Sequence, residues 1–389
     1  MDRRAFIRLS LLPVGAVGLA GCAGEESANN DGSSVDEDIT ETETAETATE
    51  NEESEDSPAG GFPTYDLPMY SNWPPETPRT NDFVLFGHAN IQILHEAGSE
   101  EVEEESPDIE DEENLLLVLP GYGFIITALW FQVGLWGYPW QGTLGNDSEP
   151  DGMETEAITM TEGTFVFHGS FDPDLFEETY ADGFEVQTND RFTIFEGEQG
   201  TETDGLAYAV AESSVVAGLQ TGEGVEHQDV ITTLNDAVEN LIAETGRVRD
   251  TDDGEFLFES TGDADLVTGF WDVNGLEEED LQTGDEPPDG SSELEENPVF
   301  NTVDSFVSVL TLPASEGGVG GDTVAARFAA VYPEGEVPSE QELREELVPS
   351  DTAEETAITR SDTRAHVMIE VSEDELERES VAAPNITGE

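Results

Sequence analysis

The chain has 389 residues, with 91 Asp and Glu against 12 basic residues, which gives a formal net charge of −79 and a sequence pI near 4.1. All 12 basic residues are Arg, so chemistry that needs a Schiff-base or P-loop Lys is excluded. The charge leaves no basic surface for nucleic acid. The single Cys excludes an intramolecular disulfide, a Cys-ligated zinc and a CxxC redox pair.

The first residues carry an export pattern. Arg3 and Arg4 are followed by Phe6, an aliphatic residue and a further base at Arg8. This pattern resembles the twin-arginine (Tat) export signal, which a receptor reads and which carries folded cargo. The apolar stretch 9–19 is too short to span a bilayer core, which needs about 20 residues, and it predicts the core of a signal peptide.

A second signal follows in register. Leu19, Ala20 and Gly21 precede Cys22, which is similar to the lipobox of lipoproteins, where small residues admit the peptidase and the Cys thiol takes the lipid. Residues 1–21 are then a signal peptide, and the mature chain has about 368 residues with a formal charge of about −81. A chance Cys after an uncleaved anchor helix is the alternative. The expected partners are the Tat translocase and membrane lipid bound through Cys22.

Residues 22–60 predict a disordered acidic tether. Between residues 23 and 60 there are 14 acids in 38 residues, and Val35 and Ile39 are the only sizeable apolar side chains. Such a composition cannot bury a core. A flexible chain of this length reaches roughly 35 Å, and like-charge repulsion extends it further. We interpret it as a spacer that holds the folded part off the lipid surface.

The folded part begins with a Pro-rich and aromatic segment at 61–80, which predicts extended chain packed across a surface. Residues 82–94 predict one or two strands broken at Gly87, and the acidic run 98–114 predicts a loop. Residues 115–140 carry no charge. We expect a buried strand at 115–119, a turn and a buried helix near 124–135; insertion at the membrane interface and a true span are the alternatives.

From residue 163, short apolar runs alternate with Gly-rich or acidic turns, which predicts successive strands. The expected strands are residues 164–170, 192–195, 206–211, 214–218 and 266–273. Asp172 and Pro173 mark the start of a short helix that ends at Tyr180. Apolar side chains at helical spacing predict an amphipathic helix over 225–245, stopped by Gly246.

The last block predicts long strands at 303–312 and 323–332, and a closing pair at 356–360 and 364–371. Between them a helix over 339–347 has Ser339 and Glu342 placed as a capping box. The pattern predicts an α+β fold, with a largely antiparallel sheet and helices packed on one face. The ectodomain spans 61–389, and the acidic loop 283–297 leaves open a division into two halves, 61–282 and 298–389.

No catalytic constellation, metal site or cofactor is predicted. No two histidines have metal-ligand spacing: His88 and His95 would project to opposite faces of a strand, and His168 is expected to be a strand residue with a satisfied ring. Residues 250–255 fail the ligand spacing of a calcium loop and predict a turn with weak cation binding. Asn146 and Asn385 match the N-glycosylation triplet.

The acid excess and the absence of Lys resemble the composition of proteins from extreme halophiles. At 1 M salt the Debye length falls to about 3 Å, so repulsion among carboxylates is largely screened. An acidic surface protein from an ordinary host is the alternative. Taken with residues 2–22, the chain is similar to twin-arginine-exported lipoproteins of halophilic archaea, which implies a lipid anchor on the outer side of the cell membrane.

Three classes of function remain open. A non-catalytic surface protein that binds or builds structure is favoured, because no catalytic motif emerges. A solute-binding lipoprotein of an importer requires two doubly wound lobes around a cleft. An extracellular hydrolase requires a pocket with converging carboxylates. The ligand, and any protein or small-molecule partner, is not defined by the sequence.

Overall fold

The computed structural model describes residues 61–77, 83–91, 115–131, 138, 153–161, 163–189, 191–218, 227–272, 298–300, 302–312, 323–348 and 356–372. The expected signal peptide (1–21), the tether (22–60) and the acidic loops at 98–114 and 283–297 lie outside the described residues.

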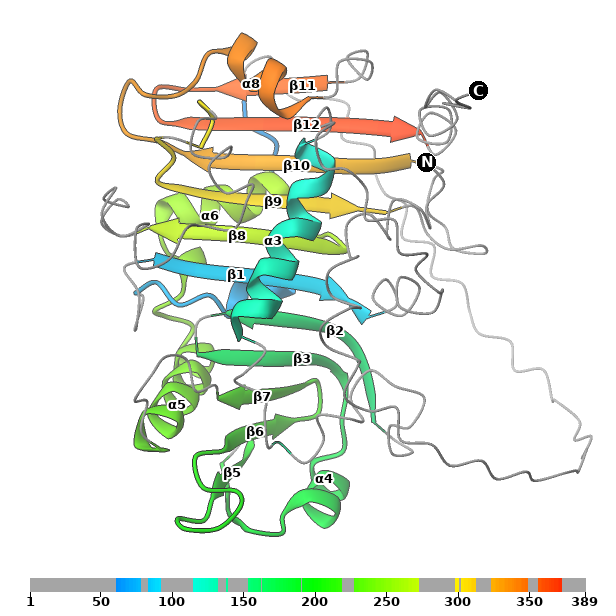
Figure 1. Cartoon of the computed structure of the whole chain (residues 1–389), viewed down its shortest axis with the longest axis vertical. Coiled ribbons are helices and arrows are strands. Elements are labelled where there is room, and N and C mark those ends of the chain that lie inside the picture. Colours follow the sequence, from blue (N-terminus) through cyan, green and yellow to red (C-terminus); the bar gives the residue numbers. More distant parts are fainter. Residues whose placement is uncertain are drawn as a thin grey trace, which may run out of the picture.

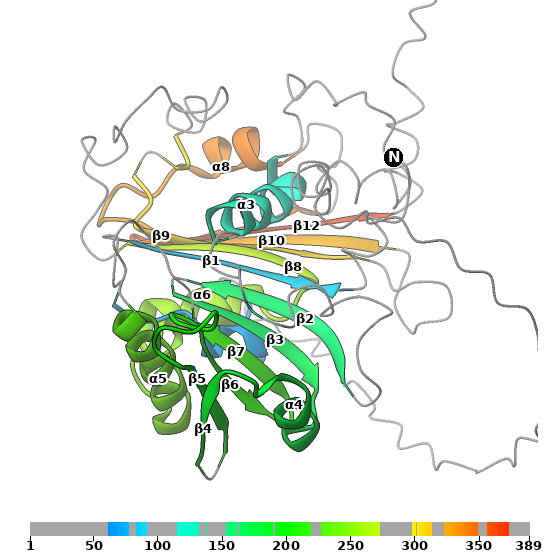
Figure 2. The same ribbon diagram turned by 60° about the horizontal axis from the view of Figure 1, so that its bottom comes forward.

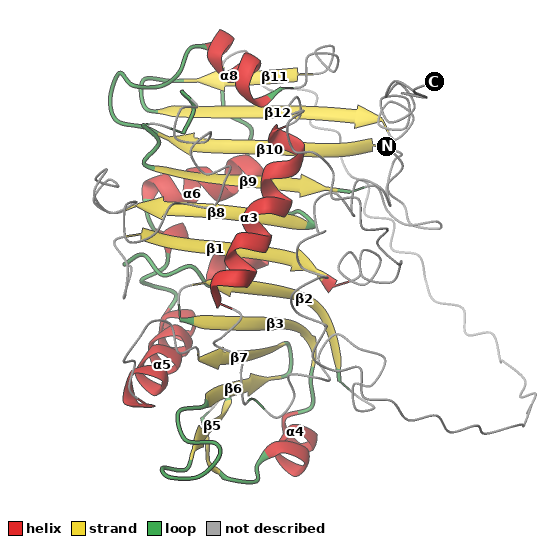
Figure 3. Ribbon diagram, in the orientation of Figure 1, coloured by secondary structure: helices red, strands yellow, loops and turns green. Residues whose placement is uncertain are grey.

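Twelve strands form one sheet in which all neighbours are antiparallel (Figures 1 and 3). The spatial order is β11-β12-β10-β9-β8-β1-β2-β3-β7-β6-β5-β4. The predicted α+β class and largely antiparallel sheet are confirmed. The strands are β1 (Phe83–Asn90), β2 (Glu154–Thr161), β3 (Thr164–Ser170), β4 (Phe184–Thr188), β5 (Thr193–Gly197), β6 (Ala207–Ala211), β7 (Ser214–Gly218), β8 (Leu266–Asp272), β9 (Ser305–Thr311), β10 (Thr323–Val331), β11 (Thr356–Arg360) and β12 (Arg364–Ser372).

β1 lies in the middle of the sheet, with β8 on one side and β2 on the other. Its register to β8 runs from Phe83 opposite Asp272 to Ala89 opposite Leu266. β8 also pairs with β9, so strands from residues 61–282 and from residues 298–389 share the sheet. The two regions on either side of the acidic loop therefore have a common core.

The helices form two layers. α3 (Leu115–Phe131) and α8 (Glu340–Leu347) lie on one face, and α5 (His227–Ala243) and α6 (Asp252–Thr261) cover the other (Figure 2). Successive side chains of a strand point to opposite faces of the sheet, so each face has its own core. Phe328 of β10 belongs to the core under α3 and α8, and its neighbour Ala329 belongs to the core under α6. The sequence predicted helices on one face, and the second layer is an addition.

α3 corrects one expectation. Residues 115–119 are the first turns of a helix that continues to Phe131, with Pro120 inside it, so the predicted strand there is wrong and the predicted buried helix starts earlier. A short apolar run does not distinguish a buried strand from a buried helix by period. Gly123 permits close contact because a Cβ there would lie 2.1 Å from Oγ1 of Thr268. No helix among the described residues is long and apolar enough to cross a membrane.

The predicted helix ends are confirmed where polar side chains define them. Asp172 caps α4 (Pro173–Tyr180) by accepting hydrogen bonds from the amides of residues 174 and 175. Ser339 and Glu342 form the capping box of α8. The predicted stop of α5 at Gly246 is late: the helix ends at Ala243, Glu244 follows it with a φ of +54°, and Gly246 has a φ of +72°.

Two strands and one α-helix were not predicted, namely β2, β4 and α6, and neither were the 3-10 helices η1 (Met69–Asn72) and η3 (Val248–Asp250). In addition, β1 continues through Gly87 rather than breaking there. A Cβ at this position would lie 3.3 Å from the ring of Phe124. Gly87 therefore marks close contact between sheet and helix rather than the end of a strand.

Candidate functional site

A buried chain of three polar side chains crosses the α5/α6 face of the sheet. His88 of β1 lies opposite Thr159 of β2 in the strand register, and His168 comes from β3. Oγ1 of Thr159 lies 2.8 Å from Nδ1 of His88 and 2.8 Å from Nε2 of His168. Because a hydroxyl has one proton, Thr159 donates to one ring and accepts an N–H from the other.

Both histidines are held neutral. Burial, followed by the charge of His168, lowers the pKa of His88 to about 3. Burial lowers the pKa of His168 to about 4. Thr159 has no exposed surface, so its hydroxyl is out of reach of a substrate. These three side chains therefore favour a structural role, because the Thr159 hydroxyl has both of its hydrogen-bond partners within the sheet.

Residues 61–77, which we call the strap, cover this chain. Tyr70, in the short 3-10 helix η1 (Met69–Asn72), lies with its ring 4.8 Å from the ring of His88, and its hydroxyl donates to the carbonyl of Gly262 at 2.6 Å. The ring of Trp73 lies 6.2 Å from that of His168. Both aromatic side chains are buried, so the strap closes the face of the sheet over the two histidines.

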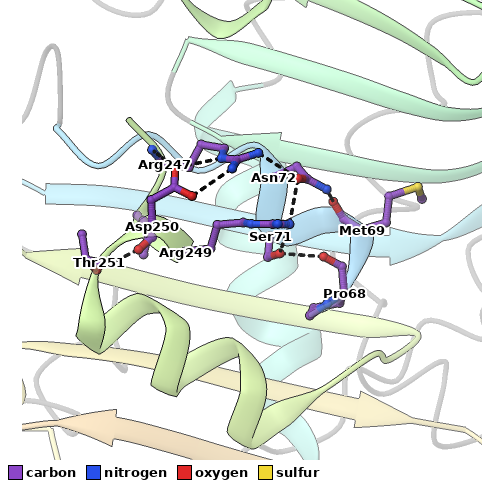
Figure 4. Close-up of polar contacts among 9 residues, drawn as sticks. Pro68, Met69, Ser71, Asn72, Arg247, Arg249, Asp250 and Thr251 are labelled. Atoms are coloured by element: carbon purple, nitrogen blue, oxygen red, sulfur yellow. Dashed lines mark hydrogen bonds and ion pairs between the residues drawn. The ribbon is translucent and has the colours of Figure 1, made fainter. Parts of the chain in front are cut away.

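Two arginines attach the end of the strap (Figure 4). Arg247 is 4% exposed and makes two hydrogen bonds of 2.9 Å to the carboxylate of Asp250. Its Nη1 donates to Oδ1 of Asn72 at 3.1 Å. Arg249 donates to the same oxygen at 2.7 Å and to Oγ of Ser71 at 3.3 Å. One amide oxygen of the strap thus accepts from two guanidinium groups.

Hydrogen bonds, burial and neighbouring charges shift the pKa values of two residues in this cluster. The hydrogen bonds from Arg247 hold the pKa of Asp250 below its ordinary value. Burial, and then the neighbouring charge of Arg247, lowers the pKa of Arg249. Two guanidinium groups face one directly bonded carboxylate, and the charge of Glu244 also acts on Arg249. The arrangement is a polar clamp between the strap and the 3-10 helix η3 (Val248–Asp250).

The outer half of the strap is attached by aromatic contacts. The ring of Phe62 lies 5.0 Å from that of Phe256. The guanidinium of Arg327 lies 4.7 Å from the centre of the Tyr65 ring, and the Tyr65 hydroxyl contacts Sδ of Met368 at 3.8 Å. These contacts connect the strap to α6, β10 and β12.

One small pocket borders the clamp. Its lining includes Trp73 and Pro75 of the strap, Thr233 and Asn240 of α5, and Arg247. Its interior volume of about 10 Å³ is close to that of one water molecule. In the described part of the chain, no three His, Cys, Asp or Glu side chains gather as a group suited to holding a metal ion.

The site residues predicted from sequence lie elsewhere in the chain. Those outside the described residues are Arg3, Arg4, Phe6, Leu19, Ala20, Gly21, Cys22, Asn146 and Asn385. The prediction for His168, a strand residue with a satisfied ring, is confirmed. The pairing of His88 with His168 through Thr159 was missed. The sequence signal for β2 is its alternation: Glu154 and Glu156 are exposed, while Thr155 and Ala157 are buried.

The turn expected at 250–255 is wrong, because these residues span the end of η3 and the start of α6. The weak cation binding expected there stays a prediction. Asp250 is bonded to Arg247, Thr251 caps α6 by accepting from the amide of Gly254, and Asp253 pairs with Arg364 at 2.7 Å. Asp252, Asp253 and Glu255 lie in the first turn of α6, where negative charge is favourable.

Comparison of the chain with protein-family models, with curated proteins and with solved structures gives no match.

Proposed function

We propose that the chain is a lipid-anchored protein on the extracellular side of the membrane of a halophilic archaeon, exported folded by the Tat translocase. The observation that carries the proposal is the register of two signals, the paired Arg3 and Arg4 and the lipobox that ends in Cys22. The acidic tether follows at once. This order, export signal, attachment point and spacer, is the order that a tethered surface protein requires.

Within this class, we propose a non-catalytic binding or structural role. The buried titratable groups of the candidate site are bonded to one another: His88 and His168 to Thr159, and Arg247 to Asp250. Such closed contacts favour stability over chemistry. The described strands form one antiparallel sheet, whereas an importer's solute-binding protein is expected to have two doubly wound lobes. That arrangement favours the surface protein over the importer component.

The use of arginine supports a high-salt setting. Arg247, Arg327 and Arg364 each bind side chains or carbonyls that join separate elements. These three arginines bind at internal junctions, and a total of 12 arginines cannot pair with most of the 91 acids. Screening by molar salt relieves that repulsion.

Anchoring is tested by fractionating cells that express signal variants. Cys22→Ser should move the protein from the membrane to the medium or leave an uncleaved precursor. Arg3→Lys with Arg4→Lys should keep it in the cytoplasm, whereas Arg8→Lys, which preserves a base outside the pair, should export normally. Unchanged membrane attachment of the Cys22→Ser variant, or unchanged export of the paired variant, contradicts the proposal.

The high-salt setting is tested by unfolding the mature chain in KCl from 0.1 to 3 M. The denaturation midpoint should rise steeply with salt and begin to level off near 1 M, where the Debye length is about 3 Å. Sucrose at matched osmolality should give much less stabilisation, because it does not screen charge. A compact, fully stable protein in salt-free water contradicts the halophilic part of the proposal.

A further inference from the structure

The strap is the first described segment after the tether, and few backbone bonds hold it. The amide of Tyr65 donates to the carbonyl of Glu259 at 2.7 Å, that of Val248 to Pro74 at 2.9 Å, and that of Glu76 to Gly246 at 3.0 Å. The last two bonds flank a single antiparallel bridge, Pro75 opposite Arg247, and no longer ladder holds the described strap. The rest of its attachment consists of side chains: Phe62, Tyr65, Tyr70, Trp73 and the arginine clamp.

The next described element is attached in a different way. β1 pairs with β8 over seven residue pairs and with β2 over five. It lies in the centre of the sheet, so removing it breaks ladders on both of its sides together. A pull from the tether therefore meets separate contacts first and a doubly paired strand afterwards.

We propose that the strap is a peelable clasp: tension on the tether detaches residues 61–77 contact by contact, before β1 and the sheet yield. The source of tension rests on the proposed anchorage, whereas the order of detachment rests on the contacts alone. Phe62 and Tyr65 leave first, because they lie nearest the tether. Tyr70 and the arginine clamp on Asn72 follow, and Trp73 and the bridge between Pro75 and Arg247 are the last attachments.

Detachment changes the surface as well as the length. Removing Tyr70 and Trp73 takes away the rings packed against His88 and His168, and removing Asn72 uncovers the guanidinium groups of Arg247 and Arg249. The peeled protein thus presents histidines and arginines on one face of an otherwise acidic molecule. Tension on the tether thus exposes a polar surface that the attached strap covers.

The experiment is single-molecule pulling on the full mature chain in 3 M KCl. One handle is attached to the unlipidated Cys22 thiol and the other to a thiol introduced by Glu212→Cys, in the exposed turn between β6 and β7. The tether should stretch without a force peak. A first event should then release about 22 residues, residues 61–82, for a contour gain of up to about 75 Å. A second event at higher force should extract β1.

Variants identify the first event. Tyr70→Ala should lower its force and leave the second event unchanged, while Met69→Ala, at a side chain that is 50% exposed on the same turn, should change neither. If Tyr70→Ala does not fold, Phe62→Ala tests the outer contact in the same way. A single event in which strap and sheet yield together overturns the proposal, as does a first force that neither Tyr70→Ala nor Phe62→Ala lowers.

Lipidation is not needed for this measurement. Absence of lipid on Cys22 in cells would remove the proposed anchorage but leave the order of detachment as measured. Conversely, a one-step unfolding trace would refute the separate detachment of the strap and would leave the proposed lipid anchor unaffected. The two proposals therefore fail on different observations.

Discussion

The rings of Tyr70 and His88 lie with their centres 4.8 Å apart. The contact joins the segment that follows the tether to the central strand of the sheet. It also covers one end of the His88–Thr159–His168 chain, so the same ring contributes to attachment and to burial of a titratable group.

Replacing Tyr70 should therefore be costly. Tyr70→Ala removes a side chain with no exposed surface and should lower the free energy of unfolding by about 3–5 kcal/mol. Tyr70→Phe keeps the ring and loses the hydrogen bond to Gly262, which should cost about 1 kcal/mol. Chemical denaturation in 3 M KCl measures both. A loss below about 1 kcal/mol for Tyr70→Ala contradicts the packing described.

Thr159 should matter through its hydroxyl rather than its size. Thr159→Val keeps the shape and leaves both ring nitrogens without their partner, for a loss of about 2–4 kcal/mol. Thr159→Ser keeps the hydroxyl and loses one methyl, for a loss of about 1 kcal/mol. Denaturation midpoints compare the two variants. A valine variant as stable as the serine variant would show that the hydrogen-bonded chain contributes nothing.

The buried histidines predict loss of stability in mild acid. Burial is the main cause that lowers the pKa of His88 to about 3, and that of His168 and His366 to about 4. Because each folded pKa lies below the unfolded value of about 6.5, the stabilisation is full above pH 6.5 and falls as pH drops toward 4. Each histidine should contribute a slope of about 1.4 kcal/mol per pH unit.

The measurement is the denaturation midpoint between pH 6.5 and 5 in 3 M KCl, a range above the ordinary pKa of carboxyl groups. Replacing His88 and His168 together by Gln, which does not titrate, should remove about two thirds of the slope and leave the share of His366. Stability that stays constant or rises as the pH falls through this range is the contrary result.

The arginine clamp predicts a contrast between buried and exposed ion pairs. Arg247→Ala removes both guanidinium bonds to Asp250 and leaves Asn72 with Arg249 alone, and it should cost about 2–3 kcal/mol. Arg247→Lys should recover only part of this, because an ammonium cannot bond both carboxylate oxygens in the fork geometry. Arg344→Ala removes an exposed pair with Glu340 and should cost less than about 0.5 kcal/mol. Equal losses for Arg247→Ala and Arg344→Ala would refute the clamp.

Local signals predicted much of the fold. β3, β7 and β11 have the predicted bounds, and Asp172 and Ser339 define helix starts as expected. These features depend on short-range chemistry, namely alternation and capping. Residues 115–119 were misjudged because five apolar residues fit a buried strand and a buried helix equally well, and only packing on β1 and β8 decides.

The candidate site depends on long-range register and was not predicted. Thr159 meets His88 because β2 pairs with β1 in one register, and a slip of one residue would turn its side chain to the opposite face. The alternation of β2 is carried by Thr and Ala rather than by large apolar residues, which weakens the signal. α6 was missed because its acidic first turn resembles a loop until Thr251 is identified as its cap.

Mass spectrometry of the amino-terminal peptide from the membrane fraction shows whether lipid anchors the protein. We expect a chain that starts at Cys22 and carries a lipid on its sulfur. A chain that starts at Met1 with an unmodified Cys22 would refute the lipid anchor.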